Sequence, residues 1–225
     1  MQAPTIVLTT GGADSTTLLH VMHTRARVVP VFVDYGQRAA HREHQAAERQ
    51  CAALGLSLRR FDMGAVGAAF RAEQQAKLHI PLPHRNLIVL SLATSYAAQI
   101  EAASIAIAVI RDDVDGYASA SLGFLEAYRR LASTLGSVTI ETPLIGFDKS
   151  AVLAEGVRLG VDFGHTYSCM LGYERHCGRC PQCKKRRAAF VAAGMPENPG
   201  FYLDDARAPE GGTAGAEGPP ESPQG

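Results

Sequence analysis

The sequence predicts an α/β fold with a doubly wound, mostly parallel sheet, and two observations lead to this prediction. Short runs of β-branched residues alternate along the chain with alanine-rich stretches of helical length, an order typical of βα units. The strand-like runs are nearly continuous in apolar character, as in parallel sheets that are covered by helices on both faces. Ligands bind at the carboxyl ends of the strands in such sheets, so we looked for a site in the residues that follow each strand.

The expected elements follow one another in regular order. The run Thr-Ile-Val-Leu-Thr predicts a first strand at 5–9, and the helix expected at 15–23 starts after two glycines. Apolar β-branched residues predict a second strand at 28–33, and an alanine-rich stretch predicts a helix at 41–54. The same two patterns then predict, in chain order, a strand at 57–61, a helix at 86–101, a strand at 104–110, a helix at 119–135, a strand at 138–142 and a helix at 149–159.

Composition sets limits on domain organisation and on partners. The 225 residues, 46% of them hydrophobic, suffice for one large core, and we expect an α/β domain at 1–165, a cysteine-bearing segment at 166–205 and a disordered tail at 206–225. The tail is rich in Pro, Gly and Glu and has no large apolar residue to bury. The 22 basic and 22 acidic residues cancel, which argues against a general binder of nucleic acid or membrane surfaces. With no membrane span and no leader in view, we expect a cytoplasmic protein.

Four of the five cysteines lie close together near the end of the chain. Cys169 is followed by Cys177, Cys180 and Cys183, and the C-x2-C-x2-C run can supply three thiolates from one tight knuckle while Cys169 supplies the fourth. We therefore predict a structural Zn²⁺ site, against the alternative of two disulfides or unlinked thiols. The fifth cysteine, Cys51, lies on an expected helix and suits a buried apolar position. The basic run at 184–187 could bind RNA, or it could balance the net charge of about −2 of a tetrathiolate zinc site.

The residues after the first strand predict an anion site. The loop contains Thr10, Gly11, Gly12, Asp14, Ser15 and Thr16. Two glycines allow a sharp turn, and the amides at the start of the following helix then face one point, where the helix dipole favours a phosphate. A carboxylate within such a loop suggests a cation, so Asp14 is the candidate Mg²⁺ ligand. The alternative is an ordinary glycine-rich turn in which Asp14 or Ser15 caps the helix.

This loop resembles the S-G-G-x-D-S loop of the ATP pyrophosphatases, with Thr10 in place of the first serine. Further blocks follow in order: Asp34 and Tyr35 with Gly-Gln-Arg, Pro-x-Pro-x-Arg85-Asn86, Asp113 with Gly-Tyr117, Asp-Lys149-Ser, and the cysteines. Together they resemble the family of 7-cyano-7-deazaguanine synthases, over residues 5 to about 202. The resemblance implies an adenine nucleotide alpha hydrolase-like fold, a homodimer, and the use of ATP and ammonia to convert 7-carboxy-7-deazaguanine into a nitrile.

Each block also has a chemical interpretation of its own. Asp34 could accept from a nucleotide and Tyr35 could stack, although a plain turn is the alternative. Arg85 and Asn86 follow two prolines and suit a phosphate or carboxylate, or else form an exposed capping pair. Lys149 could neutralise leaving pyrophosphate, or it could be a solvated lysine. We assign catalysis to Asp14, Lys149 and Arg85, nucleotide binding to the loop with Asp34 and Tyr35, and substrate binding to Arg85, Asn86, Asp113 and Tyr117 (all in the printed sequence).

The chain also departs from the family pattern. After Tyr117 the family continues with Pro-Asp-Cys-Arg, whereas this chain has Ala-Ser-Ala-Ser, so we expect a less charged pocket with room for a bulkier amine. His41 and Glu43 match the family only if one residue is inserted, and we leave them out of the site. The predicted function is an ATP-dependent ligase acting on a deazaguanine-type acid. The alternatives are a diverged paralogue that acylates another amine, even on a protein, a tRNA-modifying enzyme, and a non-catalytic zinc scaffold.

Overall fold

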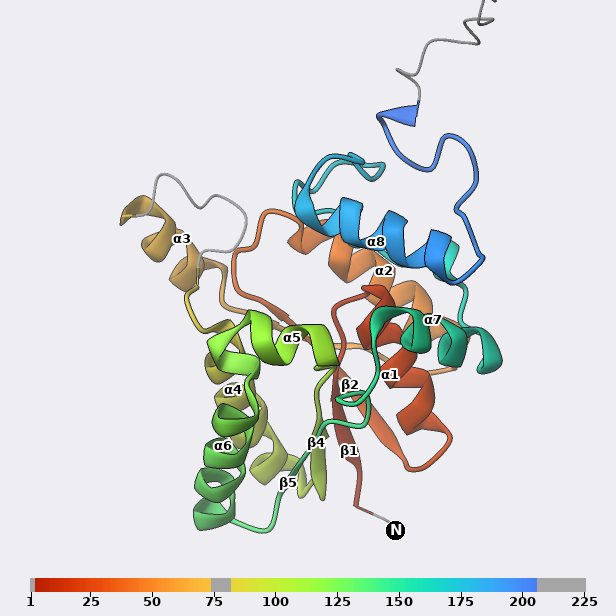
Figure 1. Cartoon of the computed structure of the whole chain (residues 1–225). Helices are drawn as coiled ribbons and strands as arrows, with labels where there is room; N and C mark the ends of the chain where they lie inside the picture. Colours follow the sequence, from red (N-terminus) through yellow and green to blue (C-terminus); the bar gives the residue numbers. More distant parts are fainter. Residues whose placement is uncertain (1–2, 74–81, 206–225) are drawn as a thin grey trace, which may run out of the picture.

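The core of the protein is a five-stranded, entirely parallel sheet (Figure 1). The computed structural model describes residues 3–73 and 82–205. The strands are β1 (Thr5–Leu8), β2 (Val28–Asp34), β3 (Arg59–Asp62), β4 (Ser104–Ala106) and β5 (Thr139–Glu141), in the spatial order β3-β2-β1-β4-β5. Thr5 of β1 is in register with Val28 on one side and with Ser104 on the other. The strand order therefore reverses between β1 and β4, and this switch point is where open α/β sheets bind ligands.

Helices connect the strands and cover the sheet. They are α1 (Ala13–His23), α2 (Ala40–Ala53), α3 (Gly64–Glu73), α4 (Arg85–Ile100), α5 (Arg111–Gly116), α6 (Leu122–Leu135), α7 (Lys149–Arg158) and α8 (Pro181–Ala192). Two short 3-10 turns lie at Ala118–Ala120 and Phe163–His165.

The two faces of the sheet bury separate clusters because successive side chains of a strand point to opposite sides. Ile6 and Leu8 of β1 belong to the cluster that contains residues of α4 and α6, whereas Val7 belongs to the cluster that contains residues of α1, α2 and α7. Figure 1 shows this layering, with α4 and α6 on one side of the sheet and α1 and α7 on the other. Cys51 lies in the second cluster, and burial raises the pKa of its thiol to about 12. Its predicted role as a buried apolar residue is confirmed.

The predicted fold class is confirmed, and all ten predicted elements are present with shifted ends. The largest shift is in the fourth strand, expected at 104–110, which ends at Ala106. The helix expected at 119–135 begins at Leu122, because Ser121 is its N-cap and accepts a hydrogen bond from the Phe124 amide. The sequence analysis missed α3, α5 and α8. The tail expected at 206–225 lies outside the described residues, and no helix within the described ranges has the length and apolar character to cross a membrane.

Candidate functional site

A cavity of about 520 Å³ opens at the carboxyl ends of β1 and β4. Its wall includes Thr9 to Ser15 except Gly11, the segment Ile107 to Val109 that follows β4, and the start of α4. This volume lies within the range of about 300–1,000 Å³ that is usual for small-molecule sites. Because β4 ends at Ala106, residues 107–109 line the cavity instead of continuing the strand. Of the predicted site residues, the cavity brings together Thr10, Gly12, Asp14, Ser15, Tyr35, Arg85, Asn86, Asp113, Tyr117 and Lys149.

The loop after β1 forms a braced anion cradle. Ser15 Oγ accepts from the Thr10 amide at 3.1 Å, lies 2.9 Å from Thr10 Oγ1 and donates to the Gly12 carbonyl at 3.2 Å. Ser15 therefore holds the loop closed, while the first amides of α1 have no carbonyl partner within the helix and face the cavity end. Gly11 has a φ of +74°, and a Cβ there would lie 2.5 Å from the Glu43 carbonyl oxygen. Gly11 and the fully buried Thr16 lie behind the cradle and do not line the cavity.

Asp14 and Lys149 form an ion pair at the mouth of this cradle. Lys149 Nζ lies 2.5 Å from the Asp14 carboxylate, and the two side chains are 23% and 25% exposed, in that order. α1 has no side-chain cap, so Asp14 does not act as the N-cap that we considered as the alternative. Lys149 is the first residue of α7, whose N-cap is Asp148. The pair places one anion and one cation beside the loop amides, an arrangement suited to a metal-bound polyphosphate.

Arg85 contributes a second cation, from the first residue of α4. Its guanidinium donates to the Tyr35 hydroxyl at 3.2 Å and lies 5.9 Å from the centre of the Tyr35 ring. The preceding residue, His84, has a left-handed backbone with a φ of +51°, which turns the chain sharply into the helix. Asp34, by contrast, does not line the cavity. It pairs with Arg60 at 2.8 Å and accepts from the Gly36 amide at 3.0 Å, a local role that matches the turn alternative.

The remaining predicted substrate residues also line the cavity. Asn86 donates to the Ser119 carbonyl at 3.0 Å and so ties the start of α4 to the turn before α6. Asp113 accepts from the Ile110 amide at 3.2 Å, and burial raises the pKa of its carboxyl. Tyr117 is 48% exposed at the cavity rim. The short, uncharged side chains of Ser119 and Ala120 line the wall beside it.

Sequence reasoning missed several cavity residues. Glu43 lies on α2 and lines the cavity, where it accepts from Gln37 Nε2 at 2.9 Å, whereas His41 is exposed. α2 begins at Ala40, with Ala39 as its N-cap, and Glu43 in its first turn lines the cavity. Glu43 and Asp113 both supply a carboxylate to the cavity. Ser168, which precedes Cys169, also lies in the wall.

The four cysteines converge as predicted and form a group that could bind a metal ion. Their sulfur atoms all lie within 4.8 Å of one another, and the Cys177 and Cys183 sulfurs are 3.8 Å apart. A tetrahedron with Zn–S bonds of about 2.3 Å has sulfur–sulfur edges of about 3.8 Å, so the group fits Zn²⁺. All four thiols are free and buried, which contradicts the disulfide alternative. The Cys180 amide donates to Cys177 Sγ at 3.2 Å and the Cys183 amide donates to Cys180 Sγ at 3.4 Å, as suits thiolate ligands.

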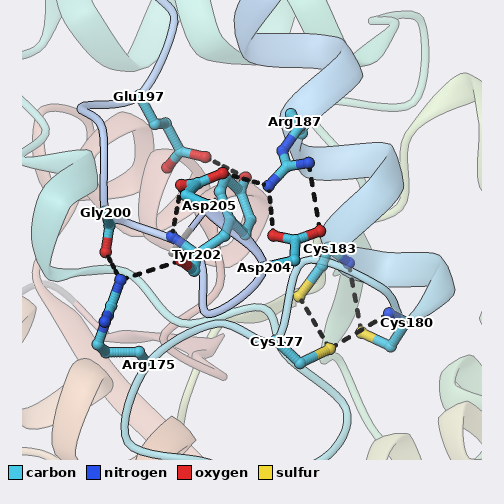
Figure 2. Close-up of polar contacts among 10 residues, drawn as sticks. All are labelled: Arg175, Cys177, Cys180, Cys183, Arg187, Glu197, Gly200, Tyr202, Asp204 and Asp205. Carbon is cyan, nitrogen blue, oxygen red and sulfur yellow. Dashed lines mark hydrogen bonds and ion pairs between the residues drawn. The ribbon is translucent and has the colours of Figure 1, made fainter. Parts of the chain in front are cut away.

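A segment at 197–205, which we call the strap, closes over this cysteine group (Figure 2). Arg187 pairs with Asp204 at 2.7 Å and with Asp205 at 2.9 Å. The Arg175 guanidinium donates to the Gly200 and Tyr202 carbonyls. Arg186, which is 1% exposed, pairs with Glu197 at 2.8 Å. Two of the four basic residues at 184–187, Arg186 and Arg187, therefore form ion pairs with the strap. Fewer cations of this run are then available to bind RNA.

Two solved structures have a similar fold. An NMN synthetase from Francisella tularensis matches with a TM-score of 0.51 and 14% identity over 90% of this chain and 81% of its own. The U34-tRNA thiolase NcsA from Methanococcus maripaludis matches with a TM-score of 0.52 and 15% identity over 91% of this chain and 70% of its own. At these identities the likeness establishes the fold alone.

Relatives found by sequence are more similar to this chain than these structures are, and the match covers nearly the whole length of each relative. A 7-cyano-7-deazaguanine synthase 1 from Sulfurisphaera tokodaii is 32% identical over 88% of this chain and 98% of its own. A 7-cyano-7-deazaguanine synthase from Rhizobium johnstonii is 34% identical over 89% and 92%. The family model described as queuosine biosynthesis protein QueC matches residues 4–194, which span the cavity and all four cysteines. The chain belongs to the QueC family of queuosine biosynthesis proteins.

Proposed function

We propose that the protein is an ATP-dependent ligase that makes 7-cyano-7-deazaguanine from 7-carboxy-7-deazaguanine and ammonia. The observation that carries this proposal is the cavity, in which the loop amides, the Asp14–Lys149 pair and Arg85 face one space. Full-length relatives are named as synthases of this product, and enzymatic activity follows from that likeness. The cavity supplies what an acid-activating enzyme needs, which is a phosphate cradle beside a site for a second anion.

The first step activates the acid. A carboxylate oxygen of the substrate attacks the α-phosphorus of ATP, and the bond to the β-phosphate oxygen breaks to release pyrophosphate. The first-turn amides of α1 and Lys149 would stabilise the charge that develops on the leaving group. Arg85, fixed by Tyr35, would hold the attacking carboxylate near the nucleotide. Asp14 would hold Mg²⁺, and that ion would supply further charge neutralisation on the phosphates.

The second stage introduces nitrogen. Ammonia attacks the acyl carbon, and AMP leaves with the oxygen that bridged this carbon and the phosphorus. Loss of one proton then gives the amide. The amide oxygen then attacks the α-phosphorus of a second ATP and displaces pyrophosphate. AMP leaves with that oxygen, and loss of the two N–H protons gives the nitrile. A carboxylate in the cavity can accept these protons, and Asp113 is the candidate because burial raises the pKa of its carboxyl. The cysteine group would hold Zn²⁺ as a structural ion, since four protein ligands leave no open position.

Product analysis tests the proposal directly. The purified protein is incubated with ATP, Mg²⁺ and 7-carboxy-7-deazaguanine, with and without ammonium, and the products are identified by mass spectrometry. We expect AMP and pyrophosphate in a 2:2:1 ratio to nitrile, following the two activations above. AMP formation that does not depend on the acid, or no AMP at all, would contradict the assignment and leave a zinc scaffold or a different substrate.

A second candidate function rests on the wall beside Tyr117. Ser119 and Ala120 present small, uncharged side chains to the cavity, where the family resemblance leads us to expect an acid and an arginine. This wall would admit an amine larger than ammonia, including one on a protein, and the reaction would then stop at an amide. The same incubation distinguishes the two, because this candidate predicts an accumulating amide or amine conjugate. Efficient conversion to the nitrile without amide build-up would exclude it.

The homodimer implied by the family resemblance also remains a proposal, and sedimentation of the purified protein tests it. The tRNA-modifying alternative predicts binding of tRNA at physiological salt. We favour the small-molecule ligase over it because the chain carries no net charge and Arg186 and Arg187 are engaged within the protein.

A further inference from the structure

Glu43 is a fixed carboxylate with an unused acceptor in the cavity. Its Oε2 accepts from Gln37 Nε2 at 2.9 Å, and Gln37 is itself anchored because its Oε1 accepts from the Tyr35 amide at 2.9 Å. Within the described residues, Glu43 Oε1 has no hydrogen-bond partner, and no cation lies within ion-pair distance of the carboxylate. The protein therefore holds the carboxylate in one orientation but leaves part of its hydrogen-bond acceptor capacity unused.

The other two carboxylates in the cavity are already engaged. Asp14 is paired with Lys149, and Asp113 accepts from the backbone at the start of α5. Glu43 differs because its neighbours are neutral donors and aromatic rings, with Arg85 acting at longer range. Glu43 is half-buried, and a carboxylate with reduced access to water and no paired cation is costly unless a ligand supplies donors. Its position thus points to a ligand that carries N–H groups.

We propose that Glu43 recognises the heterocycle of the substrate by accepting two parallel hydrogen bonds from a ring N–H and an adjacent exocyclic amino group. This inference rests on the proposed function and names the residue that selects the guanine-type ring. The ring N–H and the 2-amino group of a guanine-type base point in the same direction from adjacent positions, and the two oxygens of a carboxylate match that pair. The cations of the cavity, Arg85 and Lys149, suit the carboxylate at the other end of the substrate.

The test compares two acids and two variants. The affinities of 7-carboxy-7-deazaguanine and of the same acid without the 2-amino group are measured by calorimetry. Glu43→Gln keeps the shape of the side chain but replaces one acceptor oxygen by a donor. Glu48→Gln is the matched control, because Glu48 lies on the same helix with its side chain 55% exposed. We expect the wild type and Glu48→Gln to prefer the amino-bearing acid by about tenfold to a hundredfold, and Glu43→Gln to lose the preference while its ATP affinity and melting temperature do not fall.

Four results would overturn the inference. A wild type that binds both acids equally, or a Glu43→Gln variant that keeps the preference, would remove Glu43 from recognition and leave the proposed function intact. An equal loss of affinity for ATP and for both acids in Glu43→Gln would assign the residue to the shape of the cavity. A wild type that binds neither acid would refute the proposed function, and the inference with it.

Discussion

Replacing Asp14 by alanine should slow acid-dependent release of AMP and pyrophosphate by about a hundredfold and leave the fold almost unchanged. The carboxylate lines the cavity at the first turn of α1, and Lys149 Nζ lies 2.5 Å away. Because the Asp14 side chain is 25% exposed, loss of the ion pair should cost about 1 kcal/mol of unfolding free energy or less. Loss of a group that acts on transition-state charge costs about 3 kcal/mol, which corresponds to roughly a hundredfold in rate.

The assay follows AMP and pyrophosphate with 7-carboxy-7-deazaguanine present or absent, together with the melting temperature. Asp112→Ala is the control, because Asp112 is an exposed carboxylate that does not line the cavity. If Asp14 and Lys149 act as one unit, the double variant Asp14→Ala/Lys149→Ala should lose little more activity than either single variant.

Two results would refute the reasoning about Asp14. Undiminished AMP formation would show that the carboxylate does not act on the reacting nucleotide. A fall in melting temperature of ten degrees or more with a proportionate loss of activity would make the pair a structural contact, because a partly exposed ion pair should shift the melting temperature by about 4 °C at most.

Three further predictions concern the metal group, the loop and the buried acid. Cys180→Ser should lose bound zinc, measured by atomic absorption, and expose the C-terminal segment to protease, whereas Cys51→Ala should keep the metal. Gly11→Ala should lower the unfolding free energy by about 3 kcal/mol or more, because its Cβ would lie 2.5 Å from backbone atoms of α2; Gly55→Ala, also left-handed but in open space, should cost only about 1 kcal/mol. Burial raises the pKa of Glu43, so its charged form destabilises the fold above that pKa. Glu43→Gln should therefore raise the melting temperature at pH 7.5, and the gain should shrink as the pH falls toward 4.5; a gain that grows on acidification would contradict this.

The parts of the fold that the sequence predicted are those set by local pattern. The alternation of strand-like and helical stretches indicated all five strands, including β3, which carries two arginines and an aspartate. The glycine pair after β1 identified the cradle. The end of β4 could not be predicted, because Ile107 to Ile110 are as apolar as the strand itself, and they leave the sheet in order to line the cavity and pack beside it. The helix α8 was missed because its start lies inside the cysteine run, where Cys180 is the N-cap and Pro181 follows.

The site was predictable where a motif carried its own chemistry, and less so where the fold brought distant residues together. Asp14 and Lys149 are 135 positions apart, and sequence assigned both to the phosphates without indicating that they pair. Asp34 follows a strand as a ligand residue would, yet Arg60 on the neighbouring β3 engages it. Glu43 was left out because motif alignment is sensitive to one inserted residue, whereas a helix can absorb the insertion at its start and still direct the side chain inward.

The cysteine group is coupled to the cavity through the residues that it positions. Gln182 lies between the ligand candidates Cys180 and Cys183, and Ser168 precedes Cys169, yet both line the cavity. Ser168 is fixed by Arg186, which donates to Ser168 Oγ at 3.2 Å and also pairs with Glu197 of the strap. Because a metal that binds four thiolates contributes folding free energy to the surrounding loops, its removal should release this wall as well as the C-terminal segment. The proposed function would place the acid against this wall and ATP in the loop cradle of β1 and α1, which Ser15 braces. Chelation should therefore weaken the binding of the acid more than the binding of ATP.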